Sequence, residues 1–172
     1  REYSTLLNAT GRLGKTSLGI GTCLDNDDAK KEAISMLNSY KLEIIRSLNW
    51  FYENKDNMIE KNGYVIINAE DNIKDTLVGT LASMIAKSNL YDNAIIISMA
   101  HTIDGETKIS ARISGKNNDT DLRLILNEIV KSLGDYPCGG HKLACGALIP
   151  QDKEVEFIKI ANDVLSKIKN QL

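Results

Sequence analysis

The longest regular pattern in the sequence is a helical stripe of apolar residues between Asp25 and about Asn62. Apolar positions recur in steps of three and four from Ala33 to Phe51, and the stretch contains no Gly or Pro. Asp25 or Asn26 is expected to cap the helix N-terminus. A continuous helix over this range would be ~50 Å long. That length is more typical of a connector between two bodies than of a helix inside a globular domain.

After Gly63 the pattern changes to short strands alternating with helices. Asp104-Gly105 is a hairpin turn signal between two of the strands, and the last helix is expected to bury a stripe that begins at Val155 and ends at Leu172. The predicted strands are 64–67, 94–99, 108–113 and 147–149, and the predicted helices are 73–90, 122–133 and 152–172. This order predicts an α/β fold: a mixed β-sheet with helices packed on it, preceded by a long connector helix.

The segment before the long helix is punctuated by glycine. The pattern predicts a short helix over residues 2–9 and then a loop. The glycines that predict this loop are Gly11, Gly14, Gly19 and Gly21. The chain therefore divides into three parts, 1–24, 25–62 and 63–172, of which the last has ordinary domain size and is expected to fold independently.

Composition narrows the class of protein. Of the 172 residues, 42% are hydrophobic and 26% are charged, which is typical of an ordered globular chain. The net charge of -2 excludes a generally basic nucleic-acid-coating protein, although a local phosphate site remains compatible with it.

The longest apolar run, 94–100, is too short to span a membrane, and no signal peptide is recognisable. The odd number of cysteines favours reduced thiols and a cytoplasmic location. Because the chain begins with Arg1 rather than Met, it is expected to be part of a longer protein.

The sharpest candidate for chemistry is the segment from Cys138 to Ala147. Gly139 and Gly140 allow a sharp turn whose N–H groups could form an anion nest. His141 could then donate a hydrogen bond to a phosphate oxygen, and Lys142 adds positive charge. A plain glycine turn with His141 on the surface accounts for the same residues equally well.

Two further segments carry candidate phosphate ligands. Ser110, Arg112 and Ser114 share one face of a predicted strand, and the guanidinium fork suits a phosphate or carboxylate. These residues alone favour a solvated sheet face. Near the N-terminus, Asn8 and Arg12 lie in a segment with two glycines that fits a phosphate site and a helix C-cap equally well.

Metal and nucleophile signatures are weak. Cys138, His141 and Cys145 offer only three ligands, whereas structural zinc usually takes four, so zinc is disfavoured. The sequence has no Walker loop and no Rossmann fingerprint, and its acidic residues form no carboxylate–histidine cluster suited to two metals. His101, at the end of a predicted strand, is interpreted as a structural or surface residue and not as a ligand.

Taken together, three segments resemble the DHH-superfamily phosphoesterases of the RecJ-like exonuclease branch. The segments are Asn8–Gly14 (NATGRLG), Ser110–Ser114 (SARIS) and Gly139–Ala147 (GGHKLACGA), in the order and spacing of that branch. The last two resemble the DHH-associated C-terminal domain, with Cys145 where the family often has a small residue such as Ala. The first resembles the end of the catalytic domain. The resemblance covers essentially the whole chain.

The resemblance implies a role for each part of the chain. Residues 1–24 would be the remnant of the end of the DHH catalytic domain, 25–62 the connector helix, and 63–172 the DHH-associated substrate-binding domain. In that family, two Mn²⁺ or Mg²⁺ ions held by Asp and His side chains activate a water for attack on a phosphodiester. This sequence has no Asp-His-His motif, so the metal cluster is expected upstream. The fragment itself is expected to bind no metal and to hold no catalytic residue.

The resemblance also implies which residues contact the substrate. Arg112 and the Gly139-Gly140-His141 turn would contact substrate phosphate, and Arg12 would lie near the scissile or terminal phosphate. The full set of expected substrate-binding residues is Ser110, Arg112, Ser114, Gly139, Gly140, His141, Lys142, Asn8 and Arg12.

The function predicted in this way is the substrate-binding region of a single-strand exonuclease acting in DNA repair and replication. Its partners would be single-stranded DNA or RNA and replication proteins such as the GINS complex, with no membrane. Binding should rest on phosphate, because aromatic residues make up only 5% of the chain.

Two alternatives stay open: a short-oligonucleotide or cyclic-dinucleotide phosphodiesterase, and an inactive replication-fork scaffold. A tRNA-editing accessory domain is disfavoured by the first segment. Self-association is expected if Leu37, Ile44 and Phe51 of the connector helix are exposed.

Overall fold

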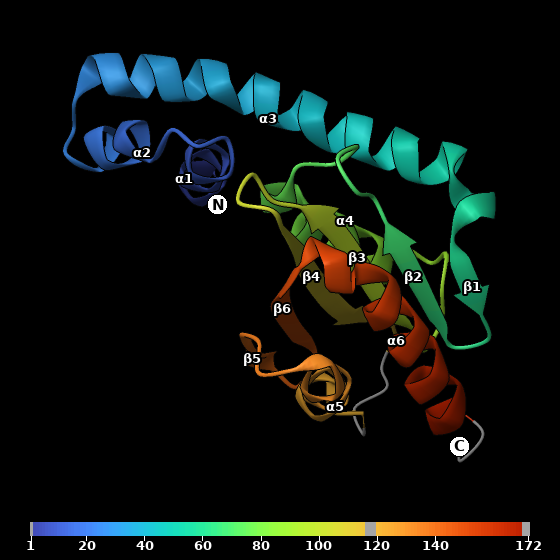
Figure 1. The fold of residues 1–172 in the computed structure, drawn as a ribbon. Helices are drawn as coiled ribbons and strands as arrows, with labels where there is room; N and C mark the ends of the chain where they lie inside the picture. Colours follow the sequence, from blue (N-terminus) through green and yellow to red (C-terminus); the bar gives the residue numbers. More distant parts are fainter. Residues whose placement is uncertain (1, 116–119, 170–172) are drawn as a thin grey trace. The chain divides into compact units, whose positions relative to one another are not determined.

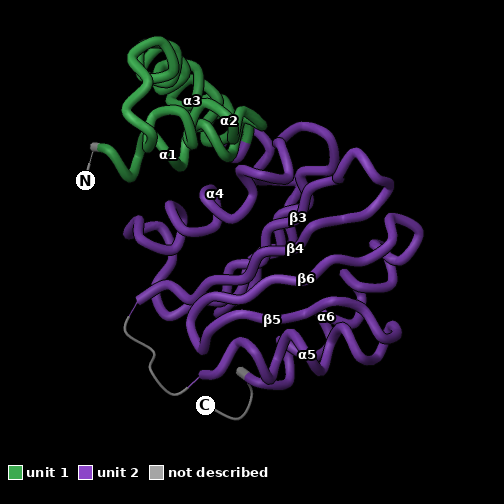
Figure 2. The backbone as a smooth tube through the Cα atoms, turned by 90° about the vertical axis from the view of Figure 1, so that its left-hand side faces the viewer, with its two compact units in different colours: residues 1–50 green, residues 51–172 purple. Residues whose placement is uncertain are grey.

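The computed structural model describes residues 2–115 and 120–169. The chain forms two compact units, residues 1–50 and 51–172, which are coloured separately in Figure 2. Arg1 and Leu172, the ends of the first and last predicted parts, lie outside the described residues. Across the part of the chain that is described, no helix is both long enough and apolar enough to cross a membrane.

The described part of the first unit is mainly helical, and the predicted glycine loop is confirmed only around Gly14, which lies between the first two helices at φ 73°. It contains α1 (Glu2–Arg12), α2 (Thr16–Cys23) and most of α3 (Asp27–Glu53). A Cβ on Gly19 would lie 2.7 Å from Thr10 Oγ1, and one on Gly21 would lie 2.7 Å from the Ala29 Cβ. These glycines therefore let helices pack closely, which is why a pattern that usually marks a loop occurs inside a helix.

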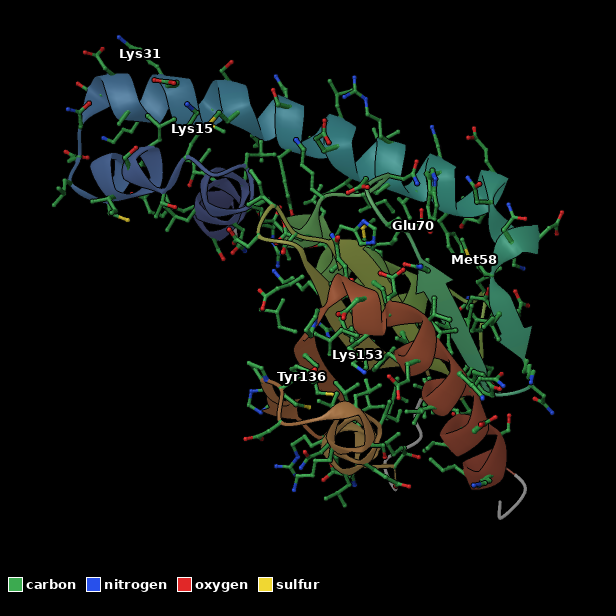
Figure 3. The ribbon with its side chains drawn as sticks, in the orientation of Figure 1. Lys15, Lys31, Met58, Glu70, Tyr136 and Lys153 are labelled. Carbon is green, nitrogen blue, oxygen red and sulfur yellow. The ribbon has the colours of Figure 1, made fainter. Side chains whose placement is uncertain are left out.

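The long helix is present but shorter than predicted. Asn26 caps it, because its Oδ1 accepts a hydrogen bond from Ala29 N at 2.9 Å. Its 27 residues make a helix of about 40 Å, with side chains such as Lys31 projecting from it (Figure 3). The helix ends at Glu53 because the following chain forms a 3-10 turn (Lys55–Asn57) and then a strand, β1.

The expected exposure of the α3 stripe is only partly met. Phe51 is fully buried, so it does not meet the condition on which self-association was expected. Leu37 and Ile44 are half-buried, whereas Ile34, Leu42 and Ile45 are more than half exposed. The apolar residues that face solvent are thus not those of the predicted stripe.

The second unit is built on a six-stranded mixed sheet with strand order β1-β2-β3-β4-β6-β5 (Figure 1). Strands β2 and β3 are parallel, and every other neighbouring pair is antiparallel. The strands are β1 (Ile59–Lys61), β2 (Tyr64–Asn68), β3 (Ile95–His101), β4 (Glu106–Ile113), β5 (Cys138–His141) and β6 (Ala144–Pro150). The predicted α/β class is confirmed. The predicted β3–β4 hairpin is confirmed as well, with Gly105 in its turn at φ 78°.

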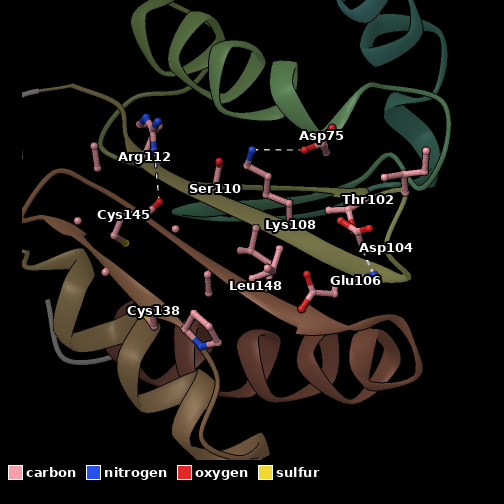
Figure 4. A pocket seen from close by; sticks show the side chains of 18 residues that line it. Asp75, Thr102, Asp104, Glu106, Lys108, Ser110, Arg112, Cys138, Cys145 and Leu148 are labelled. Carbon is pink, nitrogen blue, oxygen red and sulfur yellow. Dashed lines mark hydrogen bonds and ion pairs between the residues drawn. The ribbon is translucent and has the colours of Figure 1, made fainter. Parts of the chain in front are cut away.

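Helices cover the two faces of the sheet unequally. On one face α4 (Asp75–Lys87) packs on β3 and β4. On the other face α5 (Leu122–Leu133) and α6 (Glu154–Lys169) cover the main core. The core on that face includes Ile97, Ile109, Leu126 and Phe157. The α4 face of β6 and β5 is left without a helix, as Figure 4 shows from close by.

The last helix begins where predicted and buries most of the predicted stripe, apart from its first position. Gln151–Lys153 forms a 3-10 turn that leads into α6. Ala161 and Leu165 of the predicted stripe are buried. Val155 is 80% exposed, so its predicted place in the core is wrong, and Phe157 is fully buried at the start of the stripe.

A buried carboxylate joins the start of α6 to the strand ends. Glu154 accepts hydrogen bonds from Asn68 Nδ2 at 2.6 Å and from Thr107 Oγ1 at 2.8 Å, and it pairs with His101 Nε2 at 3.0 Å. His101 Nδ1 lies 3.2 Å from Asp71 Oδ1. Burial by itself lowers the pKa of His101, but the hydrogen bonds and negative charges of Asp71 and Glu154 outweigh it, so the pKa is raised. His101 is therefore structural, as interpreted from the sequence.

Candidate nucleic-acid interface

The α4 face of β6 and β5, together with the adjoining part of β4, is hollowed into an open groove of about 880 Å³. Arg112 lies opposite Ala144, and Ala144 lies opposite His141, so these three form one row across the strands. The next row is Ser110, Gly146 and Gly139. Directly opposed residues in an antiparallel pair point to the same face. The floor of the groove is therefore made of small side chains, with Arg112 at one side (Figure 4).

Arg112 is held in position by acceptors around it. Its Nε donates to Ser83 Oγ of α4 at 2.9 Å, and its Nη1 donates to the carbonyl oxygens of Ala111 at 2.8 Å and Cys145 at 3.3 Å. A Cβ on Gly79 would lie 3.1 Å from Ser110 Oγ and 3.4 Å from Arg112 Nη2, so glycine lets α4 approach the arginine. A guanidinium fixed in this way is pre-organised to meet a phosphate or carboxylate.

The glycine pair belongs to a strand, not to a turn, and this corrects the expected Gly139-Gly140-His141 turn. Residues 138–141 form the edge strand β5, paired with β6. Gly140 has φ 138°, and a Cβ on it would lie 2.5 Å from the Ala144 carbonyl oxygen, so only glycine fits. Gly139 faces open space, with nothing within 4 Å of a Cβ placed there. Gly139 therefore leaves the groove floor without a side chain, whereas Gly140 allows β5 to pack closely against β6.

His141 and Lys142 lie at the end of the hairpin. His141 shares the face of Arg112 through the row described above and is exposed. Lys142 is exposed in the two-residue turn that links β5 and β6, and its carbonyl oxygen accepts a hydrogen bond from Leu122 N at 2.8 Å. The turn is thus tied to the start of α5, and it presents a positive charge beside the groove.

The other predicted site residues divide into those that line the groove and those that do not. Ser110 lines it. Ser114 is fully buried, and its Oγ donates to the Ala94 carbonyl oxygen and accepts from Ala94 N at 2.9 Å. Ser114 therefore holds β4 to the start of β3, and no ligand reaches it. Asn8, which is exposed, and Arg12, which is half-buried, lie on α1 in the first unit.

Sequence analysis missed several groove residues. Asp75, Asp104, Glu106 and Lys108 line the groove, and Lys108 Nζ pairs with Asp75 Oδ2 at 3.4 Å. Glu106 and Lys108 share the alternation of Ser110 and Arg112, so the strand period alone could have identified them. No sequence signal links Asp75 to this face, because it comes from α4.

Cys138 and Cys145 are free thiols in the strands of the groove, whereas Cys23 is exposed on α2. Cys145 Sγ donates to the Leu122 carbonyl oxygen at 3.3 Å, and burial raises the pKa of this thiol to about 12. Burial also raises the pKa of Cys138. Within residues 2–115 and 120–169, no group of three or more His, Cys, Asp or Glu side chains is arranged to hold a metal ion. The residues in these ranges therefore do not fit the Mn²⁺ or Mg²⁺ pair that the resemblance implies.

Comparison with known proteins identifies the family. The DHHA1 domain family matches residues 62–167, so this chain belongs to that family. The prediction of a DHH-associated domain is confirmed. A curated relative, an uncharacterized protein of Methanocaldococcus jannaschii, is 26% identical over 95% of this chain and 34% of its own length.

Two solved structures share the fold. RecJ from Thermus thermophilus, solved in complex with Mn²⁺, is 16% identical with a TM-score of 0.67, over 95% of this chain and 23% of RecJ. The C-Ala domain of alanyl-tRNA synthetase from Aquifex aeolicus is 15% identical with a TM-score of 0.51, over 62% of this chain and 96% of that domain. The chain thus spans only about a third of the curated relative and a quarter of RecJ.

Proposed function

We propose that this chain is the substrate-binding part of a RecJ-like phosphoesterase that degrades single-stranded nucleic acid. In this proposal a phosphate of the strand lies in the groove on β4, β6 and β5, against Arg112. Residues 1–24 would be the end of the catalytic domain, and α3 would connect it to the DHH-associated domain. The fold similarity to RecJ over 95% of the chain supports this arrangement of parts.

The main observation in support of the proposal is that Arg112 lies beside a part of the groove floor that is made of glycines. Three acceptors fix the guanidinium, and Gly139 and Gly146 leave the strand face beside it without side chains. An extended backbone with phosphate groups fits such a face, because phosphate contacts need exposed donors rather than deep pockets. None of the described residues that line the groove is aromatic. Affinity would therefore rest on phosphate rather than on base stacking, and it would be largely independent of sequence.

The hydrolytic step is assigned to another part of the parent protein. Two divalent metals of a catalytic domain would activate the attacking water there. None of the described residues of this chain is arranged to hold those metals, so in this proposal they take no part in that step. The role of this chain is to bind and position the strand.

The binding test compares Arg112 variants with a matched arginine elsewhere. Fluorescence anisotropy of a labelled single strand would be measured for the unmodified chain, Arg112→Ala, Arg112→Lys and Arg123→Ala. Arg123 is an exposed arginine on α5 that pairs with Asp121. Loss of a charged hydrogen bond of about 1.5–3 kcal/mol corresponds to about 10- to 100-fold weaker binding for Arg112→Ala. Arg112→Lys should be intermediate, and Arg123→Ala should bind normally.

Salt dependence and stability separate binding from folding in this test. Removing one phosphate contact should reduce the slope of log affinity against log salt by about 0.7. Thermal unfolding of each variant shows whether the fold is retained. If folded Arg112→Ala binds with unchanged affinity and salt slope, the proposed site is wrong.

A further inference from the structure

Charge is distributed unevenly along the groove. Asp104 and Glu106 lie at the end where the β3–β4 hairpin turns, and Arg112 lies at the other end (Figure 4). Between them Lys108 is paired with Asp75 at 3.4 Å, so its charge is largely offset. The groove is therefore positive at the Arg112 end and negative at the hairpin end.

The acidic end and the Arg112 end of the groove are close enough for an extended oligonucleotide of several nucleotides to reach from one to the other. Glu106 and Arg112 are six positions apart on β4, which corresponds to about 20 Å at about 3.3 Å per residue. The floor between them carries Ser110 and Lys108 from β4 and Leu148 from β6, which lies opposite Lys108. A sugar or a base can rest on Leu148 without requiring a charge.

A strand that ran through the whole groove would place phosphates against carboxylates. Like charges repel more strongly beside a low-dielectric wall than in bulk water. Asp104 and Glu106 have no cation within ion-pair distance among the described residues, whereas Asp75 has Lys108. Their negative charge is thus available to repel a second or third phosphate, and their oxygens can accept hydrogen bonds from hydroxyl or amino groups.

We propose that Asp104 and Glu106 form an acidic barrier that makes the groove selective for the end of a strand. One phosphate contacts Arg112, and the strand ends before the two carboxylates, which then meet its uncharged terminal hydroxyl group and not a phosphate. The interior of a long strand is rejected because its phosphates would continue along the groove into the barrier. This inference rests on the proposed function, since it concerns the same groove, and it names the specificity-determining residues.

The test compares a linear single strand with a closed circle of the same sequence, each of about 40 nucleotides, a length well above the usual site size. The chain, with all 172 residues, would be titrated against both at low salt. The unmodified chain is expected to bind the linear strand at least 10-fold more tightly than the circle. Its salt slope should correspond to about one phosphate contact, near −0.7.

Variants of the two carboxylates then test whether they cause the preference for a linear strand over a circle. Asp104→Asn combined with Glu106→Gln should bind the circle at least 5-fold more tightly than the unmodified chain does, so that the gap between circle and linear strand narrows. A matched control removes two exposed carboxylates from the helices of the opposite face, Glu128→Gln on α5 and Asp163→Asn on α6. The control should leave the ratio of linear to circular affinity unchanged, which separates a local barrier from a change in net charge.

The outcomes distinguish the two proposals. If neither ligand binds, or if binding does not depend on Arg112, the proposed function fails. If both ligands bind through Arg112 with equal affinity, the proposed function stands and the acidic barrier is wrong. The barrier is also wrong if the control variant narrows the gap as much as the Asp104 and Glu106 variant does.

Discussion

The two faces of β4, β6 and β5 show how the same strands serve stability on one side and binding on the other. Toward α5 and α6 the strands present Ile109, Ala111, Cys145 and Ile149, all nearly inaccessible to solvent. Toward the groove they present Ser110, Arg112, Ala144 and Gly146. Strand alternation assigns each residue to one task. Ser110 and Arg112 border α4, which positions them, whereas Ala144 and Gly146 form the part of this face that α4 does not cover.

The two neighbouring glycines of β5 show the same difference between the packed face and the groove face. Gly140 points toward the packed side, where a Cβ would meet the backbone of Ala144 and Cys145, and Gly139 points into open space. One glycine is required by the fold, and the other by the hollow of the groove. Substitutions at these two positions should therefore separate stability from binding.

The largest expected effect is that of Gly140→Ala. The substitution adds backbone strain at positive φ to a close contact with a carbonyl oxygen, so the free energy of unfolding should fall by about 3 kcal/mol. Gly139→Ala should change it by less than about 0.5 kcal/mol. Urea unfolding of both variants measures the difference. Equal destabilisation by the two would contradict the assignment of faces.

The next effect concerns the polar cluster on the covered side. Glu154→Ala leaves the donors of Asn68 and Thr107 without their acceptor and leaves His101 without one of its two carboxylates. The free energy of unfolding should fall by about 2–3 kcal/mol. The matched control is Glu156→Ala, an exposed carboxylate two residues along α6 that pairs with Lys153. It should cost less than about 0.5 kcal/mol, and a similar loss in both variants would argue against a buried network.

A smaller effect is expected from protonation of His101. Its pKa is raised in the folded chain, so the charged imidazolium stabilises the fold at pH values below the unfolded pKa of about 6.5. That contribution is lost as the pH rises through the folded pKa. The stability difference between the unmodified chain and His101→Gln should therefore be larger at about pH 5.5 than at about pH 9. A difference that is constant between these pH values would show that the ion pairs of His101 do not contribute.

The smallest effect is that of Ser83→Ala, on the open side. Ser83 accepts a hydrogen bond from Arg112 Nε and touches no ligand in our proposal, so it acts by positioning the guanidinium. Loss of one hydrogen bond of about 0.5–1.5 kcal/mol corresponds to roughly 2- to 10-fold weaker binding. In the Arg112→Ala background the same substitution should have no further effect. An equal loss in both backgrounds would mean that Ser83 acts independently of Arg112.

Much of the second unit could be predicted from local sequence. Continuous runs such as Tyr64–Ile67 and the alternation around Ile109 indicated the strands and the correct inward positions, because burial on one or both faces leaves a direct pattern. Helix α5 was predicted with its observed bounds, Leu122–Leu133, since its apolar stripe ends at a glycine. These features depend on residues near one another in the chain.

One group of errors occurs where glycine serves tertiary packing. Gly19 and Gly21 predicted a loop but lie in a helix, because they allow close contact with Thr10 and Ala29. Gly139 and Gly140 predicted a turn but lie in an edge strand. Glycine removes a side chain in both situations, and sequence alone does not show whether conformational freedom or space is the reason.

The candidate site was predictable only residue by residue. Arg112 and His141 were identified separately, yet the β4–β6–β5 register that places them in one row comes from long-range pairing. Ser114 was included because it continues the alternation, but β4 ends at Ile113 and Ser114 turns into the core. Asp75 joins the groove through the packing of α4. No local pattern reports such contacts.

The most direct test of the central claim is to fill the groove without disturbing the fold. Gly139→Leu places a side chain in open space on the groove floor, and Val155→Leu makes a similar change at an exposed position of α6. Single-strand binding by Gly139→Leu, followed by fluorescence anisotropy, should weaken at least about 10-fold, a loss of about 1.4 kcal/mol. Its unfolding midpoint should match that of Val155→Leu. Unchanged affinity in the folded Gly139→Leu chain would contradict the assignment of this face to nucleic-acid binding.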